Sequence, residues 1–173
     1  MAKQNKDDCF FCRLYQMKTA IFYENEHFFS RFDWFPVSPG HSEVIPKKHV
    51  YSLLHLAKDE WASLQDALSK TVTAIEKTDL SAFYTKFLEN PLYGGYLTPP
   101  STEKSLEFCG KMLNHIGIGK KPQAYNYGVN DGPAAGRTVP HLHIHVIPRF
   151  IGDVEDPTGG VRCIIPGMGN YKK

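Results

Sequence analysis

The sequence lacks a long hydrophobic run. No stretch approaches the roughly 18 to 20 consecutive apolar residues that a membrane-spanning helix requires. Residues 1–8 are polar and charged and do not contain the apolar core of a signal peptide. Net charge is also small, at +2 with histidine counted as neutral, so the composition gives no sign of a broad basic surface for nucleic acid. We therefore expect a cytoplasmic protein with neither a membrane nor a nucleic acid as its partner.

Internal repeats and low-complexity segments are missing as well. The chain has 173 residues, of which 42% are hydrophobic and 22% charged, an ordinary globular balance. This balance argues against a fully disordered chain, a collagen or a coiled coil, and the length suits one domain. We predict that this domain spans residues 9–152, after a flexible N-terminus (1–8) and before a C-terminal tail (153–173).

Cysteine is scarce, with four residues in the chain. A chain of this length can bury a sufficient core without disulfide bonds. Cys9 and Cys12 form a Cys-x-x-Cys pair, which is half of a tetrahedral zinc site. Taken alone, the pair also suits a redox couple or ordinary core packing.

Hydrophobic periodicity predicts an α+β fold with an antiparallel sheet of about five strands and two main helices. The segment at residues 79–101 interrupts the pattern with prolines and glycines, and we predict an inserted, flap-like segment or a surface decoration there. The expected strands are 21–23, 28–32, 41–46, 124–129 and 139–148, and the expected helices are 58–78 and 101–115.

Histidine is the residue in unusual supply. Three of the eight histidines lie in one five-residue stretch of a predicted strand, at His141, His143 and His145. Side chains alternate along a strand, so these three imidazoles share one face at spacings of about 6.6 to 7 Å. Three interpretations are open, namely a polar outer face, a transition-metal site, and catalysis on an anion by imidazoles of fixed tautomer.

The loop before these histidines favours catalysis on an anion. Residues 130–138 contain two glycines together with Asn130, Arg137 and Thr138. Glycines allow the backbone to approach a ligand closely, and backbone amides in such a turn form a concave anion site. The guanidinium of Arg137 and the hydroxyl of Thr138 are suitable donors to phosphate oxygens.

Residues 136–149, Gly-Arg-Thr-Val-Pro-His-Leu-His-Ile-His-Val-Ile-Pro-Arg, resemble the signature of the histidine-triad (HIT) family of nucleotide hydrolases and transferases. The turn at residues 39–41, the segment at residues 44–46 and Asp33 are similar to the family too. The resemblance covers roughly residues 9–56 and 102–152. It implies a HIT-like fold and, because family members usually pair, a homodimer.

The same resemblance implies a role for each residue of the site. His143, the middle histidine, would attack the α-phosphorus of a nucleotide and form a covalent nucleotidyl-histidine. His145 would contact the phosphate and assist the leaving oxygen, with His41 and His141 completing the catalytic set. The substrate-binding residues would be Asn130, Arg137 and Thr138 for phosphate, Asp33 for the ribose hydroxyls, and Phe32 and Trp34 for the base.

A zinc site follows from the resemblance to some bacterial members and to the related galactose-1-phosphate uridylyltransferases. These proteins use the Cys-x-x-Cys pair, a histidine after the Ile-Pro-Lys strand, and the first histidine of the triad. The corresponding residues here are Cys9, Cys12, His49 and His141. We expect one structural zinc ion per chain.

The leading functional hypothesis is hydrolysis at the α-phosphate of a dinucleoside polyphosphate such as diadenosine tetraphosphate. Two alternatives lie in the same chemistry, namely hydrolysis of a nucleoside phosphoramidate and nucleotidyl transfer. A third belongs to another class, a nucleotide-binding sensor without catalysis. The presence of all three histidines favours an enzyme over a sensor.

Overall fold

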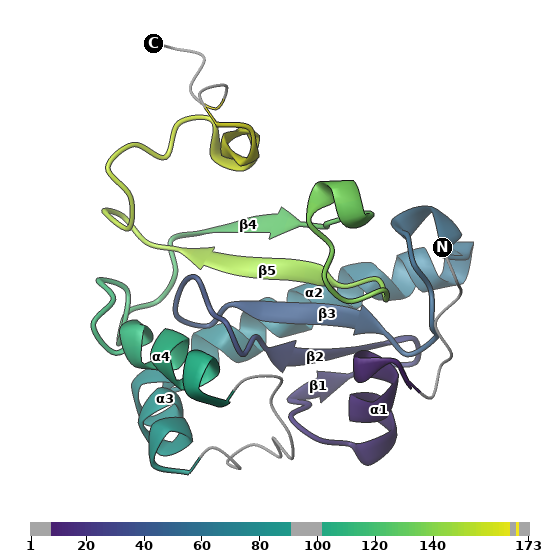
Figure 1. Cartoon of the computed structure of the whole chain (residues 1–173), viewed down its shortest axis with the longest axis horizontal. Helices are drawn as coiled ribbons and strands as arrows, with labels where there is room; N and C mark the ends of the chain where they lie inside the picture. The colour runs from purple at the N-terminus through teal and green to yellow at the C-terminus, as the bar shows by residue number, and fades with distance from the viewer. Residues whose placement is uncertain (1–7, 91–101, 167–168, 170–173) are drawn as a thin grey trace.

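The computed structural model describes residues 8–90, 102–166 and 169. Its centre is a five-stranded sheet in the order β1-β2-β3-β5-β4, in which every neighbouring pair is antiparallel (Figure 1). The predicted antiparallel sheet of an α+β fold is therefore confirmed. The strands are β1 (Tyr23–Glu24), β2 (Phe28–Phe32), β3 (Ser42–Pro46), β4 (Ala124–Gly128) and β5 (Ile144–Arg149).

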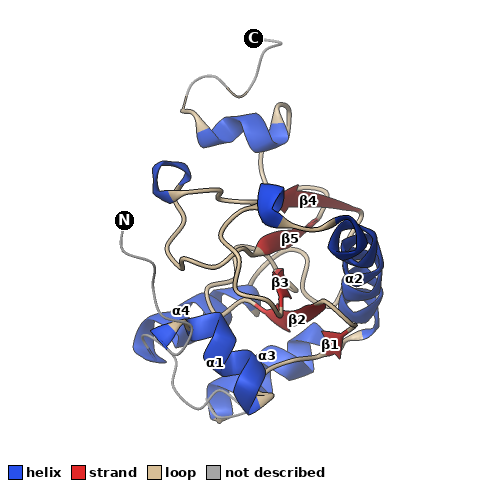
Figure 2. Cartoon of the chain, turned by 90° about the vertical axis from the view of Figure 1, so that its right-hand side faces the viewer, coloured by secondary structure: helices blue, strands red, loops and turns tan. Residues whose placement is uncertain are grey.

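In the part of the chain that the structure describes, four α-helices lie around the sheet, two more than the sequence pattern predicts. The long helix α2 lies against one face, and α1 lies on the opposite side of the sheet (Figures 1 and 2). Helices α3 and α4 pack against each other. The helices are α1 (Phe10–Met17), α2 (Lys58–Lys77), α3 (Leu80–Glu89) and α4 (Thr102–Met112).

The alternation of side chains divides the core into two clusters. Phe28, Val44 and Ile144 belong to the cluster that also contains residues of α2, while Phe29 and Ile45 belong to the cluster formed with α1. Consecutive strand residues therefore serve different faces, as the period of two requires. Because both faces are covered, every residue of β2 and β3 is buried.

Helix α3 lies within the segment that we predicted to be flap-like. Its side chains at Leu80, Tyr84 and Phe87 are buried, and the spacing of four and three residues gives one apolar helical face. The Asp79 carboxylate caps the helix by accepting a hydrogen bond from the backbone N–H of Ala82 (2.9 Å). The sequence pattern did not predict this helix, and residues 91–101 of the same segment lie outside the described residues.

Strand β5 starts at Ile144, five residues later than predicted. Residues 141 and 142 form backbone hydrogen bonds outside the sheet, because the N–H of Leu142 donates to the carbonyl of Val50 (2.7 Å) and that of His141 donates to the carbonyl of Val139 (2.8 Å). His141 and His143 consequently lie on a segment that contacts the loop after β3, and His145 alone of the three belongs to the sheet. The alternation itself is confirmed, because Leu142, Ile144 and Val146 belong to the cluster on the α2 side, whereas Phe11 of α1 contacts His141 and His143, and His143 contacts His145.

The predicted terminal segments are described only in part. Asp8 is the one residue of the predicted N-terminal segment 1–8 that the structure describes. The described part of the C-terminal tail includes a short 3-10 helix at Gly160–Ile164. Within the described ranges, no helix has both the length and the apolar character to cross a bilayer.

Candidate active site

His143 has the geometry of a nucleophile. Its ring is 5% exposed, and Nδ1 lies 2.8 Å from the carbonyl oxygen of His141. A carbonyl only accepts hydrogen bonds, so Nδ1 carries the proton and Nε2 carries a lone pair. Burial lowers the pKa of His143 below its ordinary value, despite the opposing effect of this hydrogen bond. The ring is therefore neutral near pH 7, the form that attacks phosphorus.

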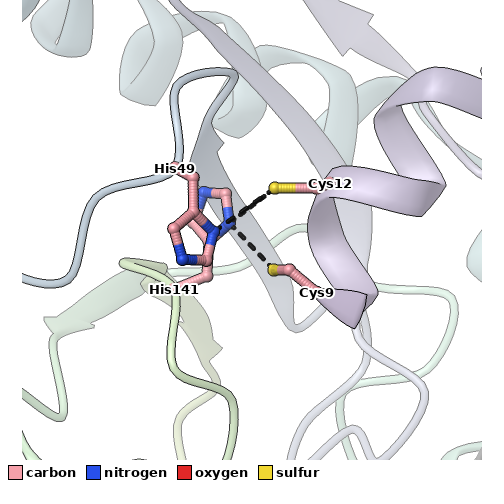
Figure 3. A group of neighbouring side chains, drawn as sticks. All are labelled: Cys9, Cys12, His49 and His141. Atoms are coloured by element: carbon pink, nitrogen blue, oxygen red, sulfur yellow. Dashed lines mark hydrogen bonds between the residues drawn. The ribbon is translucent and has the colours of Figure 1, made fainter. Parts of the chain in front are cut away.

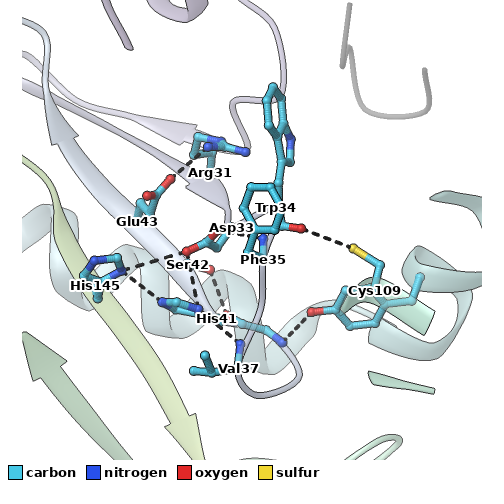
Figure 4. A network of polar contacts seen from close by, with 12 residues as sticks. Arg31, Asp33, Trp34, Phe35, Val37, His41, Ser42, Glu43, Cys109 and His145 are labelled. Carbon is cyan, nitrogen blue, oxygen red and sulfur yellow. Dashed lines mark hydrogen bonds and ion pairs between the residues drawn. The ribbon is translucent and has the colours of Figure 1, made fainter. Parts of the chain in front are cut away.

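His145 and His41 form a hydrogen-bonded pair beside the nucleophile. Nδ1 of His145 lies 3.1 Å from Nε2 of His41 (Figure 4). The rings of His143 and His145 meet edge to face at 5.0 Å. Burial and the neighbouring His41 lower the pKa of His145 to about 4. Burial also lowers the pKa of His41. Both rings are therefore neutral in the folded protein.

Asp33 completes this chain of polar groups. Its Oδ2 lies 3.4 Å from Nδ1 of His41 and 3.9 Å from Nδ1 of His145, while Oδ1 accepts from the N–H of Phe35 (2.9 Å). Burial favours the neutral acid, but the charge of Arg31 and that of His41 when it is protonated oppose it, and the pKa of Asp33 lies below its ordinary value. The carboxylate can stabilise a positive charge on either imidazole.

Nδ1 of His41 has two possible partners. Besides Asp33, the backbone N–H of Val37 lies 3.4 Å away. This nitrogen either donates to the carboxylate or accepts from the amide, and its choice fixes which nitrogens of His41 and His145 carry protons.

The four predicted metal ligands come together as a group, as the sequence hypothesis requires. Sγ of Cys9 and Sγ of Cys12 lie 3.3 and 3.6 Å from Nδ1 of His141, and Sγ of Cys12 lies 3.3 Å from Nδ1 of His49 (Figure 3). All four ligand atoms lie within 4.8 Å of one another. Tetrahedral zinc has bonds of about 2.3 Å to sulfur and 2.0 Å to nitrogen, which separates such ligands by about 3.5 Å. The group therefore fits a tetrahedral ion.

The cluster fixes the ring next to the nucleophile. Nε2 of His141 lies 2.8 Å from the carbonyl oxygen of Pro46, so this nitrogen donates and Nδ1 is left to bind a metal. The phenyl ring of Phe11 packs against both His141 and His143, at centroid distances of 5.7 and 5.2 Å. Helix α1 thus joins the metal cluster to the catalytic ring.

A cavity of about 760 Å³ opens beside His143 and His145. Aromatic side chains form much of its wall, Asp33 and Glu43 contribute carboxylates, and the loop after β4 contributes Asn130, Gly136 and Thr138. The aromatic residues are Phe10, Phe11, Trp34, Phe35 and Phe108. This combination of flat apolar surfaces and polar groups suits a nucleotide.

Two predicted substrate-binding residues are not at this cavity. Phe32 points to the opposite face of the sheet and packs against Phe22 and Phe83, each at 4.6 Å, because it precedes Asp33 by one residue in the alternation. The guanidinium of Arg137 donates to the carbonyl of Tyr51 (2.5 Å), and Arg137 is not among the residues that line the cavity. The assignment of Phe32 to the base pocket is wrong, and Arg137 holds the loop instead of facing the cavity.

The sequence hypothesis missed a buried ion pair in the cavity wall. Nη1 of Arg31 donates to Oε2 of Glu43 at 2.9 Å, and both residues line the cavity. The available signal was one acidic or basic residue within each of two neighbouring predicted strands. Lys104 and Phe108 of α4 were missed too, since they come from a helix whose position depends on tertiary packing.

Comparison with known proteins agrees with this geometry. The HIT domain family matches residues 15–152. An uncharacterised 16.1 kDa HIT-like protein of Mycoplasma pneumoniae is 29% identical over 146 residues, which cover 83% of this chain and 73% of that protein. A bis(5'-nucleosyl)-tetraphosphatase (asymmetrical) of Schizosaccharomyces pombe is 27% identical over 70% of this chain and 44% of its own length. The crystal structure of a Zn-bound histidine triad family protein from Mycobacterium smegmatis has a TM-score of 0.51, with 24% identity, over 86% of this chain and 80% of that chain.

Proposed function

Because this chain belongs to the HIT domain family, we propose that it is a nucleotidyl hydrolase that cleaves a dinucleoside polyphosphate at the α-phosphate. The observation that carries this proposal is the neutral His143 ring in the cavity wall, with Nδ1 tied to the His141 carbonyl. The relative named as a tetraphosphatase supports the choice of substrate.

In the first step the lone pair on Nε2 of His143 attacks the α-phosphorus. The N–P bond forms while the bridging P–O bond breaks, and the electron pair leaves with the polyphosphate, which is a stable anion in water. The imidazole of His143 gains a positive charge, which the hydrogen bond from Nδ1 to the His141 carbonyl stabilises. No proton has to move in this step.

In the second step water cleaves the nucleotidyl-His143 bond. In the tautomer that carries a proton on Nδ1 of His41, which lies 3.4 Å from Asp33, Nε2 of His41 accepts from Nδ1 of His145, and Nε2 of His145 is able to accept the proton of the attacking water. The O–P bond forms, the N–P bond breaks, and its electron pair returns to Nε2 of His143. The low pKa of His145 then favours release of the proton to solvent.

The loop after β4 binds the phosphate in this account. Asn130 and Thr138 line the cavity on the same side as Gly136, whose φ of 88° lies in the left-handed region. Glycine adopts this conformation without the steric cost of a side chain, and the turn brings backbone close to the cavity. Asp33 lines the cavity as well, so its predicted contact with the ribose hydroxyls stays part of the proposal.

We also propose that Cys9, Cys12, His49 and His141 hold one zinc ion. A closed site of two thiolates and two imidazoles is typical of structural zinc, which would fasten α1 to the segment before β5. The bound ion would also orient His141, whose carbonyl fixes the tautomer of His143. The homodimer and the cytoplasmic location implied above belong to this proposal.

The proposed function is tested by a turnover screen. Wild-type protein is incubated with diadenosine tetraphosphate, diadenosine triphosphate and adenosine phosphoramidate, and release of AMP is measured. We expect the two polyphosphates to be cleaved faster than the phosphoramidate, and His143→Gly to lower the rate by about 10⁴-fold or more, as loss of a nucleophile does. His55→Gly, at an exposed histidine on the 3-10 helix Leu53–His55, serves as the control and keeps the wild-type rate.

Faster cleavage of the phosphoramidate would replace the proposed substrate with the alternative one. Equal rates for His143→Gly and the wild type would refute the proposed nucleophile.

A further inference from the structure

A buried ion pair crosses the cavity side of the sheet. Arg31 on β2 and Glu43 on β3 are directly opposite in the strand register, and Glu43 is opposite His145 on β5. The three residues therefore form a row across three strands that ends at the catalytic pair (Figure 4). Arg31 is 2% exposed and Glu43 is 5% exposed.

Neither residue makes or breaks a bond in the proposed catalytic steps, and Arg31 acts on Asp33 only through its charge. Burying two charges has a desolvation cost that their mutual attraction often fails to offset, so two apolar residues would be an adequate structural choice here. The neighbouring cross-strand pair on the same face, Phe29 and Ile45, consists of two buried apolar residues. The charged pair therefore calls for a ligand-related explanation, since it lines the cavity.

Aromatic rings surround the guanidinium. The Arg31 guanidinium carbon lies 4.5 Å from the ring centre of Trp34 and 5.8 Å from that of Phe10, and these two rings meet edge to face at 5.1 Å. Phe35 and Phe108 add a second aromatic pair to the same cavity, at 5.7 Å. This end of the cavity is suited to a flat heterocycle, and the ion pair offers it polar groups.

We propose that Arg31 and Glu43 read the hydrogen-bonding edge of the nucleobase and select a base with an oxo group beside a ring N–H, so that guanine is preferred to adenine. This inference rests on the proposed function, because it names the base of the nucleotide that His143 attacks.

Donor and acceptor chemistry sets the direction of the preference. A guanidinium only donates hydrogen bonds, and a carboxylate only accepts them. Guanine presents the O6 acceptor beside the N1–H donor, which matches Arg31 and Glu43 in that order. Adenine presents the N6 amino donor beside the N1 acceptor, which reverses both contacts. A site built to hydrogen-bond one pattern strongly rejects the other, because its buried polar groups lose their partners.

The test compares two substrates that differ only in their bases. The kcat/KM of diguanosine tetraphosphate and of diadenosine tetraphosphate is measured at pH 9, because burial raises the pKa of Glu43 to about 8 and the carboxylate is ionised there. Calorimetric binding of GMP and AMP is measured in parallel, since it does not depend on turnover. We expect the wild type to prefer guanine at least tenfold in both measurements.

Variants of the pair separate base reading from folding. Arg31→Met with Glu43→Leu replaces both charges by apolar groups, so neither is left buried alone. We expect this double variant to stay folded and to lose the preference, with a guanine-to-adenine ratio within twofold of one. Glu43→Gln alone should lower the ratio at least threefold. Arg13→Met removes another cation that lines the cavity and should leave the ratio unchanged.

The possible failures are distinguishable. If the wild type cleaves both substrates at similar rates, or prefers adenine, the inference is overturned while the proposed function stands. If neither substrate is cleaved, the proposed function fails, and the GMP-to-AMP binding ratio still decides the inference. An unchanged ratio in the folded double variant would show that the pair is structural only.

Discussion

Removing one ligand of the proposed zinc site should lower the stability of the protein and disturb the segment that holds His143. The substitution is Cys12→Ser, which removes a thiolate that lies 3.3 Å from Nδ1 of His49 and 3.6 Å from Nδ1 of His141. Cys163→Ser is the matched control, since that thiol is exposed and outside the cluster. We expect one zinc ion per chain in the wild type and the control, and very little in Cys12→Ser.

The expected size of the effect follows from binding linkage. A metal present at 1,000 times its dissociation constant stabilises the folded state by about 4 kcal/mol. For a chain of this length each kcal/mol shifts the Tm by about 2–4 °C, so loss of the ion should lower it by about 8–16 °C. The buried side chains of Phe11 and Leu14 on α1 would lose packing with the metal, which adds to the loss.

The assay combines elemental analysis with thermal unfolding. The protein is purified without a metal-affinity tag, its zinc content is measured, and the Tm is recorded with and without a strong chelator. Zinc far below one ion per chain in the wild type would refute the site. A Tm that is the same for Cys12→Ser and Cys163→Ser, and insensitive to chelator, would refute its structural role.

Three other substitutions test how the site is supported. Tyr84→Phe removes the hydroxyl that accepts from the buried N–H of Gly40 (3.0 Å), so the free energy of unfolding in urea should fall by about 1–3 kcal/mol; an unchanged value would show that this contact contributes nothing. Gly40→Ala places a Cβ 2.8 Å from the side chain of Ile75 at a φ of 83°. We expect the free energy of unfolding to fall by at least about 1 kcal/mol, and turnover to fall because His41 is adjacent. A variant as stable as the wild type would contradict this. Glu43→Gln tests linkage: burial raises the pKa of Glu43 from 4.5 to about 8, so the folded state binds this proton more tightly and wild-type stability falls as pH rises between those values. We expect the free energy of unfolding in urea to fall less between pH 5 and pH 8 in Glu43→Gln than in the wild type. An equal change in the two proteins would contradict this assignment.

Local periodicity was sufficient for much of the fold. The pattern of α2 predicts a helix at residues 58–78, and the observed helix ends one residue earlier. The strand formers at residues 28–32 and the alternation at residues 124–129 likewise predict β2 and β4 within one residue. These elements have an apolar face that is visible in sequence order.

Elements stabilised by distant contacts were harder to predict. Helix α1 has eight residues, which is too short to be stable by propensity alone, and its buried side chains pack on Phe29 and Ile45 from other strands. Helix α3 shows an apolar period, but the prolines and glycines that follow it in the sequence suggested a loop. Its stability depends on packing against α4.

The same distinction holds for the site. The resemblance to the family supplied the long-range grouping of the four metal ligands and the position of His41 beside the triad, which motif spacing alone does not give. It was not enough for Arg31 and Glu43, whose contact depends on the register of β2 against β3. Phe32 was misassigned because a neighbour of Asp33 in sequence points to the other face of the sheet.

The central claim, covalent catalysis by His143, is tested most directly by trapping the intermediate. Wild-type protein is mixed with diadenosine tetraphosphate, quenched in alkaline denaturant to preserve the N–P bond, digested, and analysed by mass spectrometry. The account predicts one adenylyl group on the peptide with His143, attached to that residue, and none in His143→Gly. An adenylyl group on another residue, or turnover by the wild type with no adduct at any quench time, would contradict it.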